Sequence, residues 1–176
     1  MVKIGVLISG GGTNLQAVID GCENKSINGK VKVVISNKED AYGLERARNH
    51  KITAMCEKDE NKIIEILKEN EVELVILAGY LKIVSPKLVD EYRNKIINIH
   101  PSLIPAFCGK GYYGEKVHQG VIDYGAKVTG ATVHFVDEGA DTGPIIMQKT
   151  VEVKQDDDAK KLAERVLEVE LSLIHI

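Results

Sequence analysis

The stretch VKIGVLISGGGTNL, residues 2–15, places a short apolar run directly before three consecutive glycines. An unbroken run of branched apolar side chains is typical of a strand that is buried on both faces of a sheet. After the glycines, apolar residues recur at helical spacing from Leu15 to Ile19, and Thr13 followed by Gln16 predicts a capping box at the helix start. The stretch therefore predicts a strand, a glycine loop and a helix.

The same alternation of apolar strands and helical patterns continues along the chain. It predicts an α/β fold: a single-domain, Rossmann-like, mostly parallel sheet with helices on both faces and an antiparallel strand in the C-terminal half. Residues 101–114 contain two prolines, three glycines and two tyrosines and predict a long loop, of the kind that is usually functional or mobile. The expected strands are 2–9, 31–35, 52–56, 74–78, 95–100, 127–136 and 145–153, and the later helices are 42–50, 60–70, 86–92, one ending at 124 and one from about 158.

Composition excludes several classes of protein. With 176 residues and 44% hydrophobic side chains, the chain can bury a core without disulfides. The net charge of −3 comes without a clustered basic face, so no nucleic-acid partner is expected. Cys22, Cys56 and Cys108 form no C-x-x-C pair, and no apolar stretch is long enough to span a bilayer. A cytoplasmic location, no metal and no membrane partner are therefore expected.

The glycine triplet lies where ligands bind in open parallel sheets, between the carboxyl end of a strand and the start of a helix. Free N–H groups at a helix start attract anions. A dinucleotide fingerprint would need glycine in place of Leu15, and a triphosphate loop would need Gly-Lys-Ser/Thr where Gly12-Thr13-Asn14 stands. The sequence predicts either a tight turn without a ligand or, as we favour, a phosphate monoester bound by Gly11, Gly12, Thr13 and Asn14.

Asn98 and His100 alternate with isoleucines at the end of a predicted strand, so both are expected on the same face. Burying an amide and an imidazole among isoleucines is costly unless both find partners. The pair therefore favours a functional site, with a satisfied structural histidine as the alternative. Asp141 follows an acidic turn, and taken alone it can be either a catalytic carboxylate or an ordinary turn residue.

Five segments extend these motifs along the chain: ISGGGTNL (8–15), SNKEDAYGL (36–44), LAGYLKIVSP (77–86), INIHPSLIP (97–105), and TGATVH running on to DTGPII (129–146). In this order they resemble the glycinamide ribonucleotide formyltransferase family, which belongs to the folate-dependent formyltransferases. The resemblance covers nearly the whole chain. It implies transfer of a formyl group from 10-formyltetrahydrofolate to the amine of glycinamide ribonucleotide in de novo purine biosynthesis, by a monomer or homodimer that needs no metal.

The resemblance also implies a role for particular residues. Asn98, His100 and Asp141 would be catalytic: the amide and an imidazolium would stabilise an oxyanion, while Asp141 would orient His100 and hold a water that relays a proton. The substrate phosphate would bind Gly11 to Asn14, and Glu170 would bind the ribose and glycinamide end. Folate would bind a set of mostly apolar residues, for which plain core packing is the alternative: Leu81, Lys82, Ile83, Val84, Val89, Ile96 and Ala140.

Three features depart from the resemblance. Lys82 stands in place of the usual arginine, and Cys108 stands in place of a loop proline. The chain ends at residue 176, where the family normally continues, so residues 1–176 are expected to form a formyltransferase domain that lacks the family's C-terminal end. Of the remaining histidines, His134 is expected to be structural, and His50 and His118 are expected to lie on the surface.

Three other functions compete with amine formylation. Formyltetrahydrofolate deformylases pass the formyl group to water, but they carry an additional N-terminal regulatory domain and lack the glycine triplet. The transfer-RNA formylating relatives carry a basic C-terminal domain, for which no residues remain here. A phosphate-binding module without catalysis is the third alternative.

Overall fold

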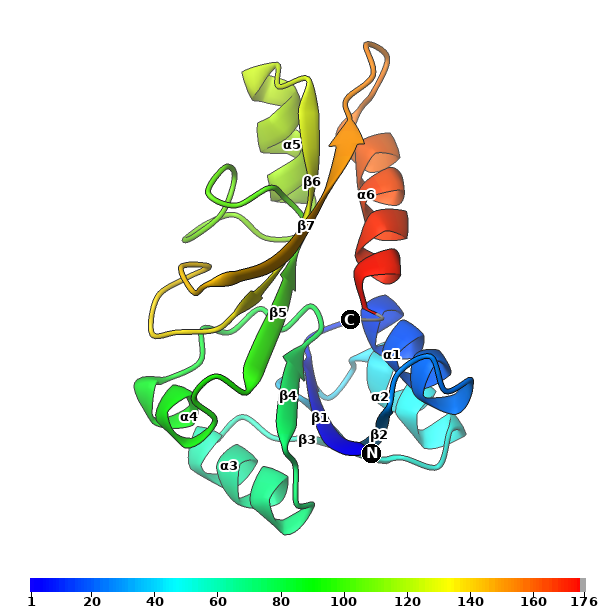
Figure 1. Cartoon of the computed structure of the whole chain (residues 1–176), viewed down its shortest axis with the longest axis vertical. Helices are drawn as coiled ribbons and strands as arrows, with labels where there is room; N and C mark the ends of the chain where they lie inside the picture. Colours follow the sequence, from blue (N-terminus) through cyan, green and yellow to red (C-terminus); the bar gives the residue numbers. More distant parts are fainter. Residues whose placement is uncertain (175–176) are drawn as a thin grey trace. The chain divides into compact units, whose positions relative to one another are not determined.

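The structure, a computed structural model, describes residues 1–174 as two compact units. The first unit comprises Met1–Ile97 together with Ile174, and the second comprises Asn98–Leu173. Figure 1 shows the elements of both units along the chain. No helix within residues 1–174 is both long enough and apolar enough to cross a membrane.

Four parallel strands form the sheet of the first unit, with β1 at its centre between β2 and β4. Valine and isoleucine lie opposite one another across these strands, and Val6, for example, pairs with both Val34 and Ile76. Such strands are buried on both faces, which explains their continuous apolar sequence. The strands are β1 (Val2–Ile8), β2 (Gly29–Ser36), β3 (Thr53–Cys56) and β4 (Leu74–Leu77).

Helices cover both faces of this sheet (Figure 1), with α1 and α2 packed against each other and against β2, and with α3 and α4 in mutual contact. Ser85 begins α4 as predicted, because its hydroxyl accepts a hydrogen bond from the Leu88 N–H and Pro86 follows in the first turn. The helices of the unit are α1 (Thr13–Glu23), α2 (Tyr42–Asn49), α3 (Glu60–Glu69) and α4 (Pro86–Glu91).

The second unit is built on an antiparallel pair, β6 (Val128–Phe135) and β7 (Ile145–Glu152). Helix α6 (Ala159–Leu173) packs on both strands and on α5 (Glu115–Tyr124). The register of the pair shifts between Val133 and His134, at the end of β6 that leads to the acidic turn.

Strand β5 (Ile96–His100) begins in the first unit and ends in the second. The strand order is β3-β2-β1-β4-β5-β6-β7, with one antiparallel pair at its C-terminal end. This order confirms the predicted α/β fold class with a mostly parallel sheet.

The predicted capping box of α1 is wrong. Gly12 is the N-cap and adopts the left-handed conformation, with φ 71° and ψ 34°, and no side chain caps the helix. Thr13 is already the first helical residue, one position too late to cap. Gln16 has other partners, because its amide reaches Asp20 and His50.

Candidate active site

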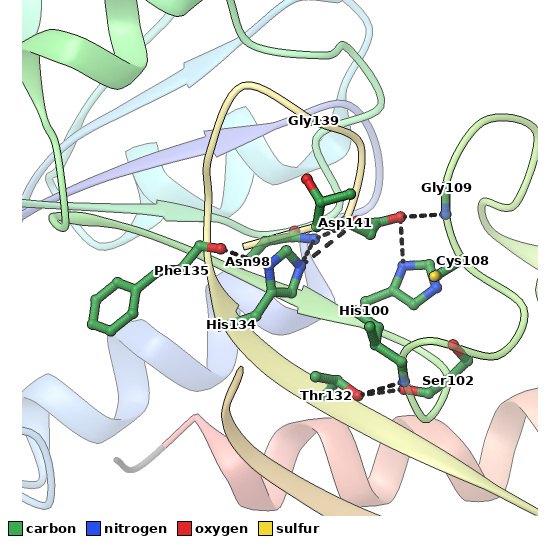
Figure 2. A network of polar contacts seen from close by, with 12 residues as sticks. Asn98, His100, Ser102, Cys108, Gly109, Thr132, His134, Phe135, Gly139 and Asp141 are labelled. Carbon is green, nitrogen blue, oxygen red and sulfur yellow. Dashed lines mark hydrogen bonds and ion pairs between the residues drawn. The ribbon is translucent and has the colours of Figure 1, made fainter. Parts of the chain in front are cut away.

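Asn98, His100 and Asp141 lie together in the second unit (Figure 2). The first two come from the end of β5, and Asp141 comes from the turn between β6 and β7. Alternation along β5 places both side chains on the same face, where Asp141 contacts each of them. The structure thus brings together the three residues for which the sequence predicts a catalytic role.

Both ring nitrogens of His100 face oxygen atoms. Nε2 donates to the Phe107 carbonyl over 3.0 Å, because a carbonyl can only accept. Nδ1 lies 3.5 Å from Oδ2 of Asp141. A doubly protonated imidazolium satisfies both neighbours, whereas a neutral ring would turn a lone pair toward the carboxylate.

The Asp141 carboxylate is the centre of this cluster. Burial alone would raise the pKa of Asp141, but the His134 and His100 imidazoles and the Gly109 N–H, which donates to Oδ2 over 2.9 Å, together hold that pKa below its usual value. Asp141 itself has a positive φ of 57°, a conformation that aspartate tolerates better than most side chains. An ionised carboxylate is therefore fixed between an amide and an imidazole.

His134 is the member of the cluster that the sequence interpretation underestimated. Its Nδ1 donates to the Phe135 carbonyl over 2.7 Å. Its Nε2 lies 3.1 Å from the Asn98 amide nitrogen, from which a neutral ring accepts, and 3.6 Å from Oδ1 of Asp141, to which a charged ring donates. The same amide nitrogen also lies 3.4 Å from Oδ1 of Asp141. His134 thereby fixes which way the Asn98 amide points. The sequence carried a signal, since a histidine at the end of a strand that is buried from Thr129 to His134 needs a polar partner.

A hydrogen-bonded brace holds the loop that covers His100. Thr132 on β6 donates to the Ser102 carbonyl over 2.7 Å and accepts from the Ile104 N–H over 3.1 Å. Gln148 on β7 reaches the Ile104 carbonyl over 3.0 Å. The predicted loop 101–114 is therefore fixed at its start, before it supplies the Phe107 carbonyl and the Gly109 N–H to the cluster.

His118 is not a surface histidine, contrary to expectation. It is only 5% exposed, because it lies three residues before Val121 on the face of α5 that packs inward. Desolvation by burial, and next the charge of His100, lower the pKa of His118. The helical spacing of Val117 and Val121 could have identified this burial from the sequence.

The glycine loop of the first unit connects β1 to α1. Gly10 and Gly11 are exposed, and Gly12 and Asn14 are half-buried. A Cβ placed on Gly10 or Gly11 would meet nothing within 4 Å, so the loop is open on that side. An open glycine loop at the N-terminus of an eleven-residue helix is suited to an anion.

The residues predicted to bind folate divide into two groups. Leu81 and Ile83 are 52% and 61% exposed, an unusual state for large apolar side chains. Val84, Val89 and Ile96 are buried at 5% exposure or less, which agrees with core packing. Lys82, also predicted to bind folate, donates from Nζ to the Lys58 carbonyl over 3.1 Å in the same unit.

The remaining predicted residues lie in the second unit. Ala140 is half-buried next to Asp141, and Glu170 lies on the buried side of α6, with 8% exposure. The Cys108 thiol donates to the Pro105 carbonyl over 3.3 Å, and burial together with the Asp141 charge raises the pKa of that thiol. Within residues 1–174, no group of three or more His, Cys, Asp or Glu side chains could hold a metal ion.

Known proteins resemble this chain along nearly its whole length. The phosphoribosylglycinamide formyltransferase of Haemophilus influenzae is 41% identical over 98% of this chain and 84% of its own length. The chloroplastic phosphoribosylglycinamide formyltransferase of Vigna unguiculata is 44% identical over 97% of this chain, which spans only 58% of that relative. The crystal structure of glycinamide ribonucleotide transformylase 1 from Symbiobacterium toebii superposes with a TM-score of 0.93, at 43% identity, over 99% of this chain and 84% of that one.

The family assignment rests on a match to the profile of a whole family. The profile of the family described as formyl transferase matches residues 2–175. The matched range includes the glycine loop, Asn98, His100 and Asp141. This chain belongs to the formyl transferase family.

Proposed function

We propose that this chain transfers a formyl group from 10-formyltetrahydrofolate to the amine of glycinamide ribonucleotide. The observation that carries the proposal is the Asp141 carboxylate, which contacts both the Asn98 amide and the His100 imidazole. Relatives at 41% and 44% identity whose names state phosphoribosylglycinamide formyltransferase supply the substrate class. The folate derivative supplies the formyl carbon that the amine attacks.

His100 and Asn98 are the proposed donors to the oxyanion that develops on the formyl oxygen. The Phe107 carbonyl supports this role, because an acceptor 3.0 Å from Nε2 occupies the position that an oxyanion would take. Substrate would replace this carbonyl at Nε2. The Asn98 amide nitrogen would exchange its 3.4 Å contact with Asp141 for the same oxyanion and keep its bond to His134.

Asp141 is the proposed route for the proton that leaves the attacking amine. The carboxylate stays ionised at neutral pH, because its neighbours hold its pKa below the usual value, and it can therefore accept a proton through a bridging water. Protonating Asp141 would also remove the negative charge that faces Nδ1 of His100. One residue would thus couple proton removal to oxyanion stabilisation.

We propose the remaining contacts from the predicted residues of each unit. In the first unit, Gly11 to Asn14 bind the substrate phosphate, and the exposed Leu81 and Ile83 contact the folate ring with Lys82 beside them. In the second unit, Glu170 binds the ribose and glycinamide end, and Ala140 contributes to the folate contacts. A cytoplasmic location and a monomer or homodimer complete the proposal, and the free state of all three cysteines agrees with a reducing compartment.

Release of tetrahydrofolate, followed by absorbance, tests the proposed reaction. Release that requires glycinamide ribonucleotide supports amine formylation, release without the amine indicates hydrolysis, and no release indicates a binding module. The variant His100→Ala is expected to stop turnover and to keep the affinity for ribose 5-phosphate. Unchanged turnover in His100→Ala contradicts the proposed mechanism.

A further inference from the structure

The glycine loop packs directly on the first turn of α2. The Gly43 N–H donates to the Gly10 carbonyl over 3.0 Å. A Cβ on Gly12 would lie 2.7 Å from the Gly43 Cα, so backbone meets backbone at this contact. Such close approach requires glycine at both positions, and it fixes one side of the loop against the helix.

Arg46 makes a second connection from the same helix. Its Nε donates to the Gly11 carbonyl over 2.8 Å, and its Nη1 donates to Oε1 of Gln16 on α1 over 3.4 Å. The guanidinium also lies over the Tyr42 ring, 5.0 Å from its centroid. One planar group therefore joins the loop, α1 and α2, and the ring below it limits its motion.

These two bonds determine where the loop N–H groups point. In a trans peptide the C=O and N–H groups point in opposite directions. The Gly10 carbonyl faces Gly43, so the N–H of Gly11 points away from α2. The Gly11 carbonyl faces Arg46, so the N–H of Gly12 points away as well. Within residues 1–174 neither N–H has an acceptor.

We propose that Arg46 is a positioning residue for the phosphate of the amine substrate. It acts through the Gly11 carbonyl: by holding that peptide, it aims the Gly12 N–H at the anion before the substrate arrives. The inference rests on the proposed phosphate contacts of Gly11 to Asn14 and adds a side chain that those contacts do not include. Its positive charge beside the loop further favours an anionic ligand.

The positioning role is distinguished from a general structural role by testing variants of two arginines with the amine substrate, with and without its phosphate. The variants are Arg46→Met and, as a matched control on the same helix, Arg48→Met, since Arg48 is exposed and pairs with Glu45 over 3.8 Å. Arg46→Met is expected to raise the KM for glycinamide ribonucleotide about tenfold, as for one lost hydrogen bond to a charged ligand site. In Arg46→Met, the KM for the folate donor and the kcat/KM for the amine without its phosphate are expected to stay within about twofold of wild type. In Arg48→Met, all of these kinetic constants are expected to stay within about twofold of wild type.

If Arg46→Met lost kcat/KM equally for the phosphorylated and unphosphorylated amines, the proposal would be overturned, because a structural defect does not distinguish the two substrates. An equal increase in KM in Arg48→Met would also overturn the proposal, because the loss of one positive charge would then explain the effect of both substitutions. If the wild-type protein transfers no formyl group, the proposed function is contradicted. The role of Arg46 is then tested by measuring phosphate binding directly.

That direct measurement is a titration with ribose 5-phosphate, followed by the amide NMR signals of Gly11 and Gly12. If Arg46→Met does not fold, the same titration is carried out on Arg46→Lys. Lysine keeps the charge but has no N–H at the Nε position, so Arg46→Lys is expected to bind ribose 5-phosphate several-fold more weakly and to shift both signals less. Affinity equal to that of wild type would refute the role of Arg46.

Discussion

The two regions that carry the proposed function differ in the chemical groups that they present to a ligand. The glycine loop of the first unit presents backbone N–H groups. Hydrogen bonds from the Gly43 N–H and from Arg46 to the loop carbonyls fix its shape. The cluster of the second unit presents side chains, and Asn98, His100 and Asp141 fix one another. The backbone site tolerates no added atom at Gly12, where it packs on the Gly43 backbone, whereas the side-chain site tolerates no missing partner. Different substitutions should therefore break each region.

The largest effect is expected from Asp141→Asn in the side-chain region. The amide keeps the shape of the carboxylate but cannot take a proton and puts no negative charge beside His100, so kcat is expected to fall about 1,000-fold, within the usual range for a lost acid–base group. Asp123→Asn is the matched control, because Asp123 is an exposed carboxylate that accepts a hydrogen bond from Gln119 on the same helix. Stopped-flow release of tetrahydrofolate measures both variants, and a loss below tenfold would remove Asp141 from the proposed proton route.

In the backbone region, Gly12→Ala is expected to have the next largest effect. The new methyl group would lie 2.7 Å from the Gly43 Cα at a φ of 71°, so the loop must move. We expect a loss of about 1–3 kcal/mol in the free energy of unfolding. Losing two N–H bonds to a phosphate, at about 1.5 kcal/mol each, would raise the KM for the phosphorylated amine about 100-fold.

Gly11→Ala is the control for the stability part of that prediction. A Cβ there meets nothing within 4 Å, so urea unfolding of Gly11→Ala should match wild type closely. If both alanine variants lose the same stability, backbone packing on α2 does not shape the loop.

A smaller effect is expected from His134→Leu, which removes a partner and leaves Asp141 in place. The Asn98 amide would lose the acceptor 3.1 Å away that fixes its orientation, and kcat is expected to fall about tenfold, as for one misdirected hydrogen bond. The KM for the phosphorylated amine should not change. His134→Gln, which can offer an acceptor to the same amide, should recover part of the rate, and failure to recover any would indicate a packing defect instead.

The sequence predicted the elements of both regions well, because local patterns determine them. Nearby residues alone determine the nearly continuous apolar run of 2–8, the apolar run of 74–77 and the Ser85-Pro86 start of α4. The alternation of Asn98 and His100 along a strand likewise predicts their shared face.

Features that depend on distant partners could not be predicted. His134 joins the cluster through an amide 36 residues away; its buried strand signals that it needs a polar partner, but no local pattern identifies Asn98 as that partner. The left-handed Gly12 follows from its contact with Gly43 on another helix, so the capping-box pattern at Thr13 gave a wrong start for α1. Arg46 was not predicted for the same reason, since its bond to Gly11 spans 35 residues.

The smallest expected effect concerns stability and pH in the side-chain region. Burial lowers the pKa of His118 below its ordinary value of 6.5, so in the window between the two values the unfolded chain binds more protons than the folded one. The contribution of His118 is therefore complete above pH 6.5 and is lost as the pH falls toward the lowered value. His118→Leu should flatten the decrease in unfolding free energy between pH 7.5 and pH 5.5, measured by urea denaturation. Gln119→Ala, one residue along on the exposed side of α5, should leave the decrease unchanged, and an equal slope in His118→Leu would show that other groups cause it.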